Sequence, residues 1–140
     1  MLLKVLVDNN TYIDEYYYGE PGVCYYIENN TDKILFDCGY SDIFIKNAKK
    51  MNIDLSKVNK IIISHGHNNH TGGLKYLIDL KITNDVELIT HPNSLNYKEE
   101  DNINIGSPVL KSELEKIWNL NLSKKPIKIS DNLYFLGEFH

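Results

Sequence analysis

The sequence predicts a single α/β domain built on one mixed β-sheet, and three observations lead to this fold class. Runs of β-branched residues, such as residues 61–63, alternate along the chain with segments whose apolar residues recur at helical spacing. Residues 23–28 and 33–37 flank an Asn-Asn-Thr-Asp turn and are expected to form an antiparallel hairpin. The length of 140 residues allows one sizeable core but not two.

The first part of the chain is predicted to contain a strand, a loop, the hairpin and a helix. Residues 2–7 form a strand that is apolar on both faces apart from Lys4. Residues 12–22 are polar and aromatic, which favours a long loop. Ser41 is expected to be the N-cap of a helix over residues 42–51.

The remaining elements follow from the same patterns. Residues 60–64 form the central strand, residues 73–80 a helix and residues 86–90 a further strand. Ser112 opens a Ser-Glu-Leu-Glu capping box, which predicts a short helix that ends near Trp118. The last two predicted strands are residues 127–129 and 133–136.

Both faces of the predicted sheet should be covered, because residues 2–7 and 61–63 are apolar on both sides. The helices can cover one face. No segment obviously covers the other, and a large apolar face in water promotes association. We therefore expect helices on one face and a partner on the second.

Composition excludes several functional classes. A formal net charge of −4, without any Lys/Arg cluster, argues against a nucleic-acid-binding protein. No apolar run approaches the roughly 18 residues of a membrane span, and we expect no signal peptide. The chain has only two cysteines, Cys24 and Cys38, and they lie far apart in the sequence, which is typical of a protein with reduced thiols. We therefore expect a cytoplasmic protein.

Three histidines follow the central strand within six positions. His65 and His67 are separated by one residue, so in an extended segment their rings leave on the same side and can bind one ion at about 2.0–2.1 Å. His70 begins the next helix, from which it can face the same pocket. A polar loop with surface histidines is the alternative, but the H-x-H-x-N-H spacing after a buried strand favours a metal site.

Residues 64–74, Ser-His-Gly-His-Asn-Asn-His-Thr-Gly-Gly-Leu, resemble the H-x-H-x-D-H loop of the metallo-β-lactamase superfamily of metal-dependent hydrolases. Shorter segments resemble the branch that contains 7,8-dihydropterin-6-methyl-4-(β-D-ribofuranosyl)aminobenzene 5′-phosphate synthase. These segments are residues 7–11, 34–39, 53–56, 91–92, 105–108 and 136–138. The resemblance extends in order over essentially the whole chain.

The resemblance implies a fold and an activity. Residues 1–140 would form a single truncated domain, the N-terminal half of an αββα sandwich, with a mixed sheet and helices on one face. The complete enzyme would use zinc or a similar divalent metal to activate water. His65 and His67 would bind the first metal and His70 the second.

The resemblance also suggests roles for other polar residues. Asp37 would contact the metal ligands without binding the metal, or would hold their loop in place. An equal alternative is that Asp37 only forms a turn at the end of its strand. His91 would line the substrate pocket, and an ordinary hydrogen-bonded histidine is the alternative. His140 is the last residue, and we expect it to be frayed.

Two departures from the family pattern bear on activity. Asn69 occupies the position of the family's catalytic aspartate, and an amide can neither carry the negative charge nor take a proton from water. We therefore expect one weakly bound ion. The family's second half, with the remaining ligands, has no counterpart here, so one chain offers the first metal only His65 and His67, fewer than the three ligands usual for catalytic zinc.

Two hypotheses follow. In the first, the chain is a metal-dependent hydrolase of a small-molecule substrate, completed by a partner. That partner is a second copy, bound through the apolar sheet face with more than about 2,000 Å² buried, or a separately encoded second half. A third alternative is that the chain is a cut or truncated piece of a longer protein. In the second, it is a non-catalytic half-domain that serves as a structural or partner-binding homodimer with little or no metal.

Overall fold

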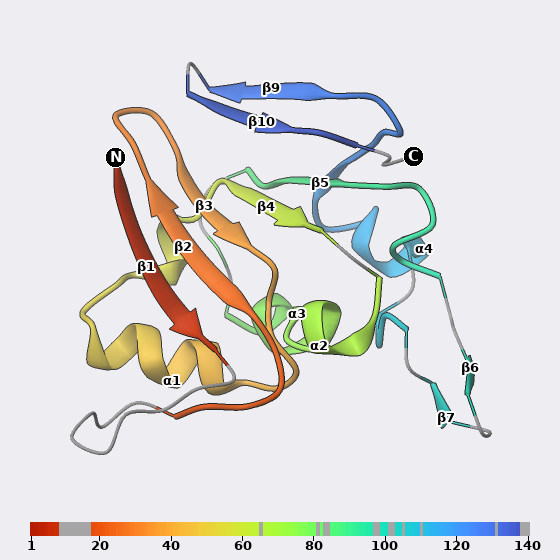
Figure 1. Cartoon of the computed structure of the whole chain (residues 1–140), viewed down its shortest axis with the longest axis horizontal. Coiled ribbons are helices and arrows are strands. Elements are labelled where there is room, and N and C mark those ends of the chain that lie inside the picture. Colours follow the sequence, from red (N-terminus) through yellow and green to blue (C-terminus); the bar gives the residue numbers. More distant parts are fainter. Residues whose placement is uncertain are drawn as a thin grey trace.

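The computed structural model has a six-stranded sheet with helices on one face and a two-stranded hairpin across the other (Figure 1). The residues that it describes are 1–8, 18–64, 66–80, 82, 85–96, 99–100, 103–104, 106–109, 111–130 and 132–137. The expected mixed sheet is confirmed, and so are the helices on one face.

The sheet is antiparallel at one side and parallel at the other. In spatial order its strands are β1 (Leu2–Val7), β2 (Cys24–Glu28), β3 (Lys33–Phe36), β4 (Lys60–Ile63), β5 (Glu87–Thr90) and β8 (Asn119–Leu122). Strands β1 to β3 are antiparallel, whereas β3, β4, β5 and β8 run parallel to one another. The carboxyl ends of the four parallel strands therefore meet at one edge of the sheet.

The helices bury the first face of the sheet. They are α1 (Ile43–Lys50), α2 (Asn68–Thr71), α3 (Leu74–Ile78) and α4 (Lys111–Leu114), and a 3-10 turn, η1, spans Leu55–Lys57. The core on this side contains Phe44 of α1 and Leu77 of α3 against Leu35, Ile61 and Ile63 of the sheet, all fully buried. This core fixes the positions of the segments that connect the parallel strands to the helices.

A C-terminal hairpin, β9 (Ile127–Ser130) and β10 (Leu133–Phe135), lies over the second face (Figure 1). It contributes apolar side chains to a second cluster around Ile34, Ile62 and Ile89, which are at most 3% exposed. The expectation that no segment of this chain covers the second face was therefore wrong. Both strands of the hairpin were predicted, but strand patterns alone do not show on which sheet face a hairpin packs.

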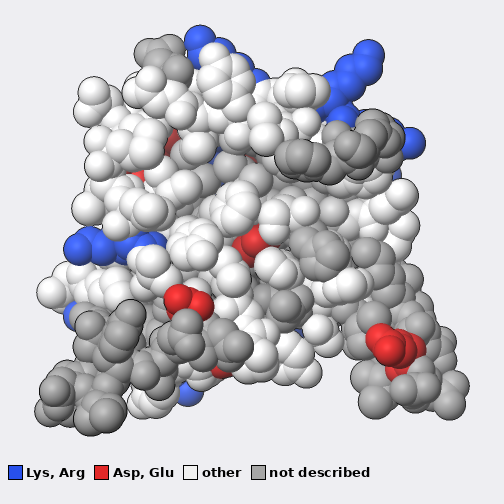
Figure 2. Space-filling model, in the orientation of Figure 1, with Lys and Arg blue, Asp and Glu red and all other residues white. Residues whose placement is uncertain are grey.

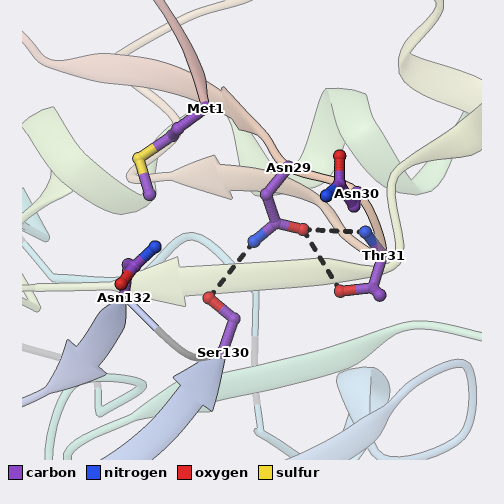
Figure 3. A pocket seen from close by; sticks show the side chains of 6 residues that line it. All are labelled: Met1, Asn29, Asn30, Thr31, Ser130 and Asn132. Atoms are coloured by element: carbon purple, nitrogen blue, oxygen red, sulfur yellow. Dashed lines mark hydrogen bonds between the residues drawn. The ribbon is translucent and has the colours of Figure 1, made fainter.

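A polar contact ties the hairpin to the main sheet. The Asn29 side-chain amide donates to Ser130 Oγ at 3.2 Å, and its oxygen accepts from the N–H and the hydroxyl of Thr31 (Figure 3). The same oxygen also accepts from the Asp32 N–H. These residues lie at the end of the sheet opposite the carboxyl ends of β3 and β4. Met1, Asn30 and Asn132 line the same polar pocket (Figure 3).

The hairpin leaves part of the second face exposed. Leu3 and Val5 of β1 pair with residues of β2 that share this face, and they are 59% and 45% exposed. Between the hairpin and the sheet lies an apolar crevice of about 280 Å³, lined by residues that include Phe36, Ile62 and Leu136. The second layer thus covers the middle of the sheet but not its β1 side.

Two local expectations differ from the structure, and three strands were not predicted. Ser112 lies inside α4 rather than at its N-cap. Asp42, not Ser41, is the N-cap of α1, although Ser41 Oγ accepts a long hydrogen bond of 3.4 Å from the Ile43 N–H. Strand β8 was not predicted because its two asparagines have low strand propensity; it joins the sheet through its parallel ladder with β5. The sequence left residues 93–107 unassigned, and they contain β6 (Glu99–Glu100) and β7 (Ile103–Asn104).

The charges of the described residues are dispersed. On the face that Figure 2 shows, Lys side chains stand at the margins and most of the middle is uncharged. Of the helices in the described part of the chain, none combines the length and apolar character that crossing a bilayer requires.

Candidate metal centre

The candidate site forms where β3 and β4 end. Asp37 directly follows β3, and its N–H donates to Ile62 O at 2.7 Å, which extends the parallel ladder by one bond. Its backbone then turns into the left-handed region, with φ of 58°. Aspartate tolerates this conformation better than most residues, because its short side chain can bond locally. The turn points the Asp37 carboxylate toward the segment after β4.

The Asp37 carboxylate joins that segment to the histidine loop. One oxygen accepts from the Ser64 N–H at 2.8 Å, and the other accepts from Ser64 Oγ at 2.5 Å. The second oxygen also lies 2.8 Å from His70 Nδ1. Asp37 is only 1% exposed, so these contacts satisfy a buried carboxylate. The structure thus places Asp37 against both Ser64 and His70, and its role in supporting metal ligands stays a prediction.

The histidine loop continues into a single turn of helix, α2. His67 is the N-cap of α2, with an extended backbone, and its carbonyl oxygen accepts from the N–H groups of His70 and Thr71 at 3.0 and 3.1 Å. The rings of both histidines are partly buried. His65 lies outside the described residues, and so does the side chain of Asn69. The structure therefore describes two of the three predicted ligands, on one short segment.

Two glycines allow this segment to touch the loop after β3. A Cβ on Gly72 would lie 2.2 Å from Tyr40 O, and one on Gly73 would lie 2.0 Å from Cys38 O. Two backbone hydrogen bonds join the same segments, from Cys38 N–H to His70 O at 2.8 Å and from Gly73 N–H to Gly39 O at 3.2 Å. Only glycine fits such a close backbone approach. The sequence motif contains this Gly-Gly pair, but its packing role depends on the tertiary structure.

His91 lies at the same edge of the sheet, one strand further along. It follows Thr90, the partner of Ile63 in the β4–β5 ladder, so it occupies the register position of Ser64. Its Nδ1 accepts from the Asn93 N–H at 3.1 Å, which closes a local turn. The position suits a pocket residue, and this role stays a prediction. His140 lies outside the described residues.

The cysteine beside Asp37 is not equipped to bind metal. Cys24 and Cys38 are both free and fully buried. Burial raises the pKa of both thiols well above the ordinary value, and the nearby Asp37 charge adds to the effect. Thiols that stay protonated are poor metal ligands, since the thiolate is the binding form. Among the described residues, the imidazoles of His67 and His70 are therefore better candidate donors than these thiols.

The described residues provide some, but not all, of what a metal site requires. A carboxylate that accepts from Nδ1 of a histidine fixes the ring and its tautomer, so that the histidine would bind metal through Nε2. His70 has this arrangement with Asp37. Among the described residues, which omit His65, no three His, Cys, Asp or Glu side chains are grouped closely enough to hold an ion. His67 and His70 would therefore need further donors to hold an ion.

Comparison with known proteins agrees with this geometry. The family model described as the metallo-beta-lactamase superfamily matches residues 17–127. Two proteins of Methanocaldococcus jannaschii are similar. The uncharacterized protein MJ0448 is 31% identical over 137 residues, which cover 97% of this chain and 52% of that protein. The second is a 7,8-dihydropterin-6-methyl-4-(beta-D-ribofuranosyl)-aminobenzene-5′-phosphate synthase, 30% identical over 87% of this chain and 45% of its own length.

A solved structure gives the same result. Tm1679, described as a metal-dependent hydrolase of the beta-lactamase superfamily, superposes with a TM-score of 0.73 at 28% identity. The match covers 96% of this chain and 47% of Tm1679. The chain therefore spans about half the length of the relatives that it matches.

Proposed function

Because the chain belongs to the metallo-β-lactamase superfamily, we propose that it is the metal-binding half of a metal-dependent hydrolase, completed by a second polypeptide. The observation that carries the proposal is the hydrogen bond of 2.8 Å between His70 Nδ1 and the buried Asp37 carboxylate. Proteins use this arrangement to orient metal-binding histidines.

Asn69 removes the anionic ligand that a second, closely spaced ion would need, so in this chain His65, His67 and His70 would hold one ion together. A divalent metal bound there, such as zinc, supplies a water of lowered pKa for attack on an ester or phosphoester. Asp37 fixes the His70 ring, and Ser64 in turn holds Asp37 through two hydrogen bonds. The similarity to a protein named as a dihydropterin phosphate synthase supports a phosphorylated or heterocyclic substrate.

Metal titration tests the proposal. We expect the purified chain to bind Zn²⁺ or Mn²⁺ at one equivalent or less, and His67→Ala and His70→Ala to abolish this binding. His140→Ala removes a histidine outside the loop and serves as the matched control. Wild-type protein that binds neither ion, alone or with its partner, would refute the proposal.

A second candidate function is a non-catalytic half-domain, which Asn69 favours. The amide removes the anionic ligand that two closely spaced dications require. This candidate predicts an inert protein in which Asn69→Asp creates tighter metal binding. Phosphodiesterase or esterase turnover by the unchanged chain, lost with His67→Ala, would reject it.

We propose that the completing polypeptide is a second copy of this chain, bound on the second sheet face. The hairpin covers only the middle of that face, and Leu3 and Val5 are left exposed beside it. The exposed apolar side chains Tyr134 and Leu136 of the hairpin region adjoin the crevice. Burying these surfaces together would extend the second layer and bring a second set of donors to the assembly.

The oligomeric state tests this step. We expect a dimer by light scattering, and Leu3→Glu or Val5→Glu should dissociate it. Ile117→Glu is the matched control, because Ile117 is 51% exposed and follows α4, on a different element. A stable wild-type monomer would refute self-association, and binding of a separately encoded second half would then identify the alternative partner.

A further inference from the structure

We propose that Glu20 is a positioning residue for the histidine loop and acts by clamping the segment against which that loop packs. This inference rests on the proposed function for its purpose, although the clamp itself can be measured in metal-free protein. Glu20 precedes β2 and lies far from the histidines in the sequence. Sequence patterns gave it no role.

The Glu20 carboxylate holds residues 39–41 with both of its oxygens. Oε1 accepts from the backbone N–H groups of Tyr40 and Ser41 at 2.8 and 3.1 Å. Oε2 accepts from Ser41 Oγ at 2.6 Å. A Cβ on Gly39 would lie 2.8 Å from Oε1, so the carboxylate also sits directly against this backbone. Hydrogen bonds to a charged group are stronger than those between neutral groups, so three such bonds hold this backbone firmly against Glu20.

The clamped segment is in turn locked to the histidine loop. Gly39 O accepts from the Gly73 N–H, and the N–H of the preceding residue, Cys38, donates to His70 O. The two segments are in close backbone contact, because Cys38 O lies against Gly73 and Tyr40 O lies against Gly72. Neither segment can therefore shift without the other. A displacement of residues 39–41 would therefore move the His70 backbone.

Glu20 is itself held by the core of the domain. The buried Asn47 of α1 accepts from the Tyr18 N–H at 3.0 Å and donates to Tyr18 O at 2.8 Å. Its side-chain amide also donates to Leu6 O of β1 at 2.7 Å. These bonds fix the chain two residues before Glu20. The contacts thus run from the core through Tyr18 and Glu20 to the loop after β3, and from there to His70.

The geometry makes a specific claim about the side chain. Glutamine in place of Glu20 keeps an oxygen that accepts both backbone N–H groups, and its amide can donate to Ser41 Oγ, which then acts as the acceptor. Alanine removes all three bonds. If Glu20 positions the loop through hydrogen bonds, Glu20→Gln should behave like the wild type, whereas Glu20→Ala should loosen the loop.

Amide hydrogen exchange of the metal-free full chain, followed by NMR, provides the test. In Glu20→Ala we expect the amides of Cys38 and Gly73 to exchange at least about tenfold faster, as loss of bonds to a charged group predicts. Amides of β4 and β5 should keep their rates. Glu20→Gln should restore the slow exchange. Glu115→Ala, which removes an exposed carboxylate paired with Lys111 at 3.6 Å, is the matched control and should change neither group.

A parallel Mn²⁺ titration links the clamp to metal binding. We expect the dissociation constant to rise at least about tenfold in Glu20→Ala and to stay near the wild-type value in Glu20→Gln. Unchanged exchange at Cys38 and Gly73 in Glu20→Ala would overturn the proposal, and so would uniform acceleration that includes β4 and β5. If the wild type binds no metal while the alanine variant still loosens these amides, the metal proposal fails and the clamp stands.

Discussion

Replacing Asp37 by asparagine should weaken metal binding by changing the tautomer of His70. The carboxylate accepts at 2.8 Å from His70 Nδ1, which leaves Nε2 as the nitrogen suited to a metal. In the Asp37→Asn variant, a side-chain amide that donates toward Nδ1 would favour the tautomer with the proton on Nε2, which cannot bind an ion. Asparagine also tolerates the φ of 58° at this position, so the backbone should stay in place.

The expected loss follows from these contacts. Removing a carboxylate that orients a metal-binding histidine costs about 10–100-fold in metal affinity, or about 1.4–2.7 kcal/mol. The free energy of unfolding should change less, because the side-chain oxygen of the new asparagine can still accept from the Ser64 N–H. In the wild type this N–H lies 2.8 Å from the Asp37 carboxylate. The Asp37→Asn variant therefore separates metal affinity from folding.

Two measurements check this prediction. Competition titration with Zn²⁺ gives the affinity, and two-dimensional ¹⁵N NMR of the imidazole rings reports the tautomer of His70. Asp42→Asn is the matched control, because the Asp42 side chain is 42% exposed and its ion pair with Lys46 is long, at 3.8 Å. Unchanged zinc affinity together with an unchanged His70 tautomer would show that Asp37 does not orient the ligand.

Three further predictions concern stability and reactivity. Gly73→Ala should destabilise the fold by about 3 kcal/mol or more in urea unfolding, because its Cβ would lie 2.0 Å from Cys38 O; a cost under about 1 kcal/mol would contradict the close packing. Burial alone would raise the pKa of Asp32, but hydrogen bonds and the charge of Lys60 lower this pKa below its ordinary value of 3.8. The ionised Asp32 therefore stabilises the fold at pH values above 3.8, and this stabilisation is lost as the pH falls through the lowered pKa. Unfolding curves from about pH 5 to pH 2 should show this loss in the wild type and a smaller one in Asp32→Asn. The thiols of Cys24 and Cys38 should react with a disulfide reagent only as fast as the protein opens, because both are buried with a raised pKa; fast reaction in native buffer would argue against this packing.

The strands and the superfamily could be predicted from local patterns. Residues 61–63 are β-branched and apolar on both faces, and few structures other than a buried strand accept such a run. The histidine spacing after that strand identified the superfamily, which the family model and the structural match confirm. Such features are recognisable because each depends on neighbours in the chain.

Other features required the tertiary structure. The hairpin covers Ile34, Ile62 and Ile89, yet the same alternation would allow it to pack elsewhere or to remain exposed. Strand β8 has a weak pattern of its own and exists because β5 offers it a parallel edge. The contact of Asp37 with Ser64 and His70 joins residues about 30 positions apart, and Glu20 reaches Ser41 across 21.

The histidine loop illustrates the division most clearly. Its residue types and spacing alone indicated imidazole donors, because metal chemistry limits which side chains can serve. The support behind those donors comes from backbone atoms and carboxylates brought together by the sheet and by α1, and no local pattern encodes such long-range distances. The sequence by itself therefore determined the family and most of its strands, and only the tertiary structure decided what holds the loop in place.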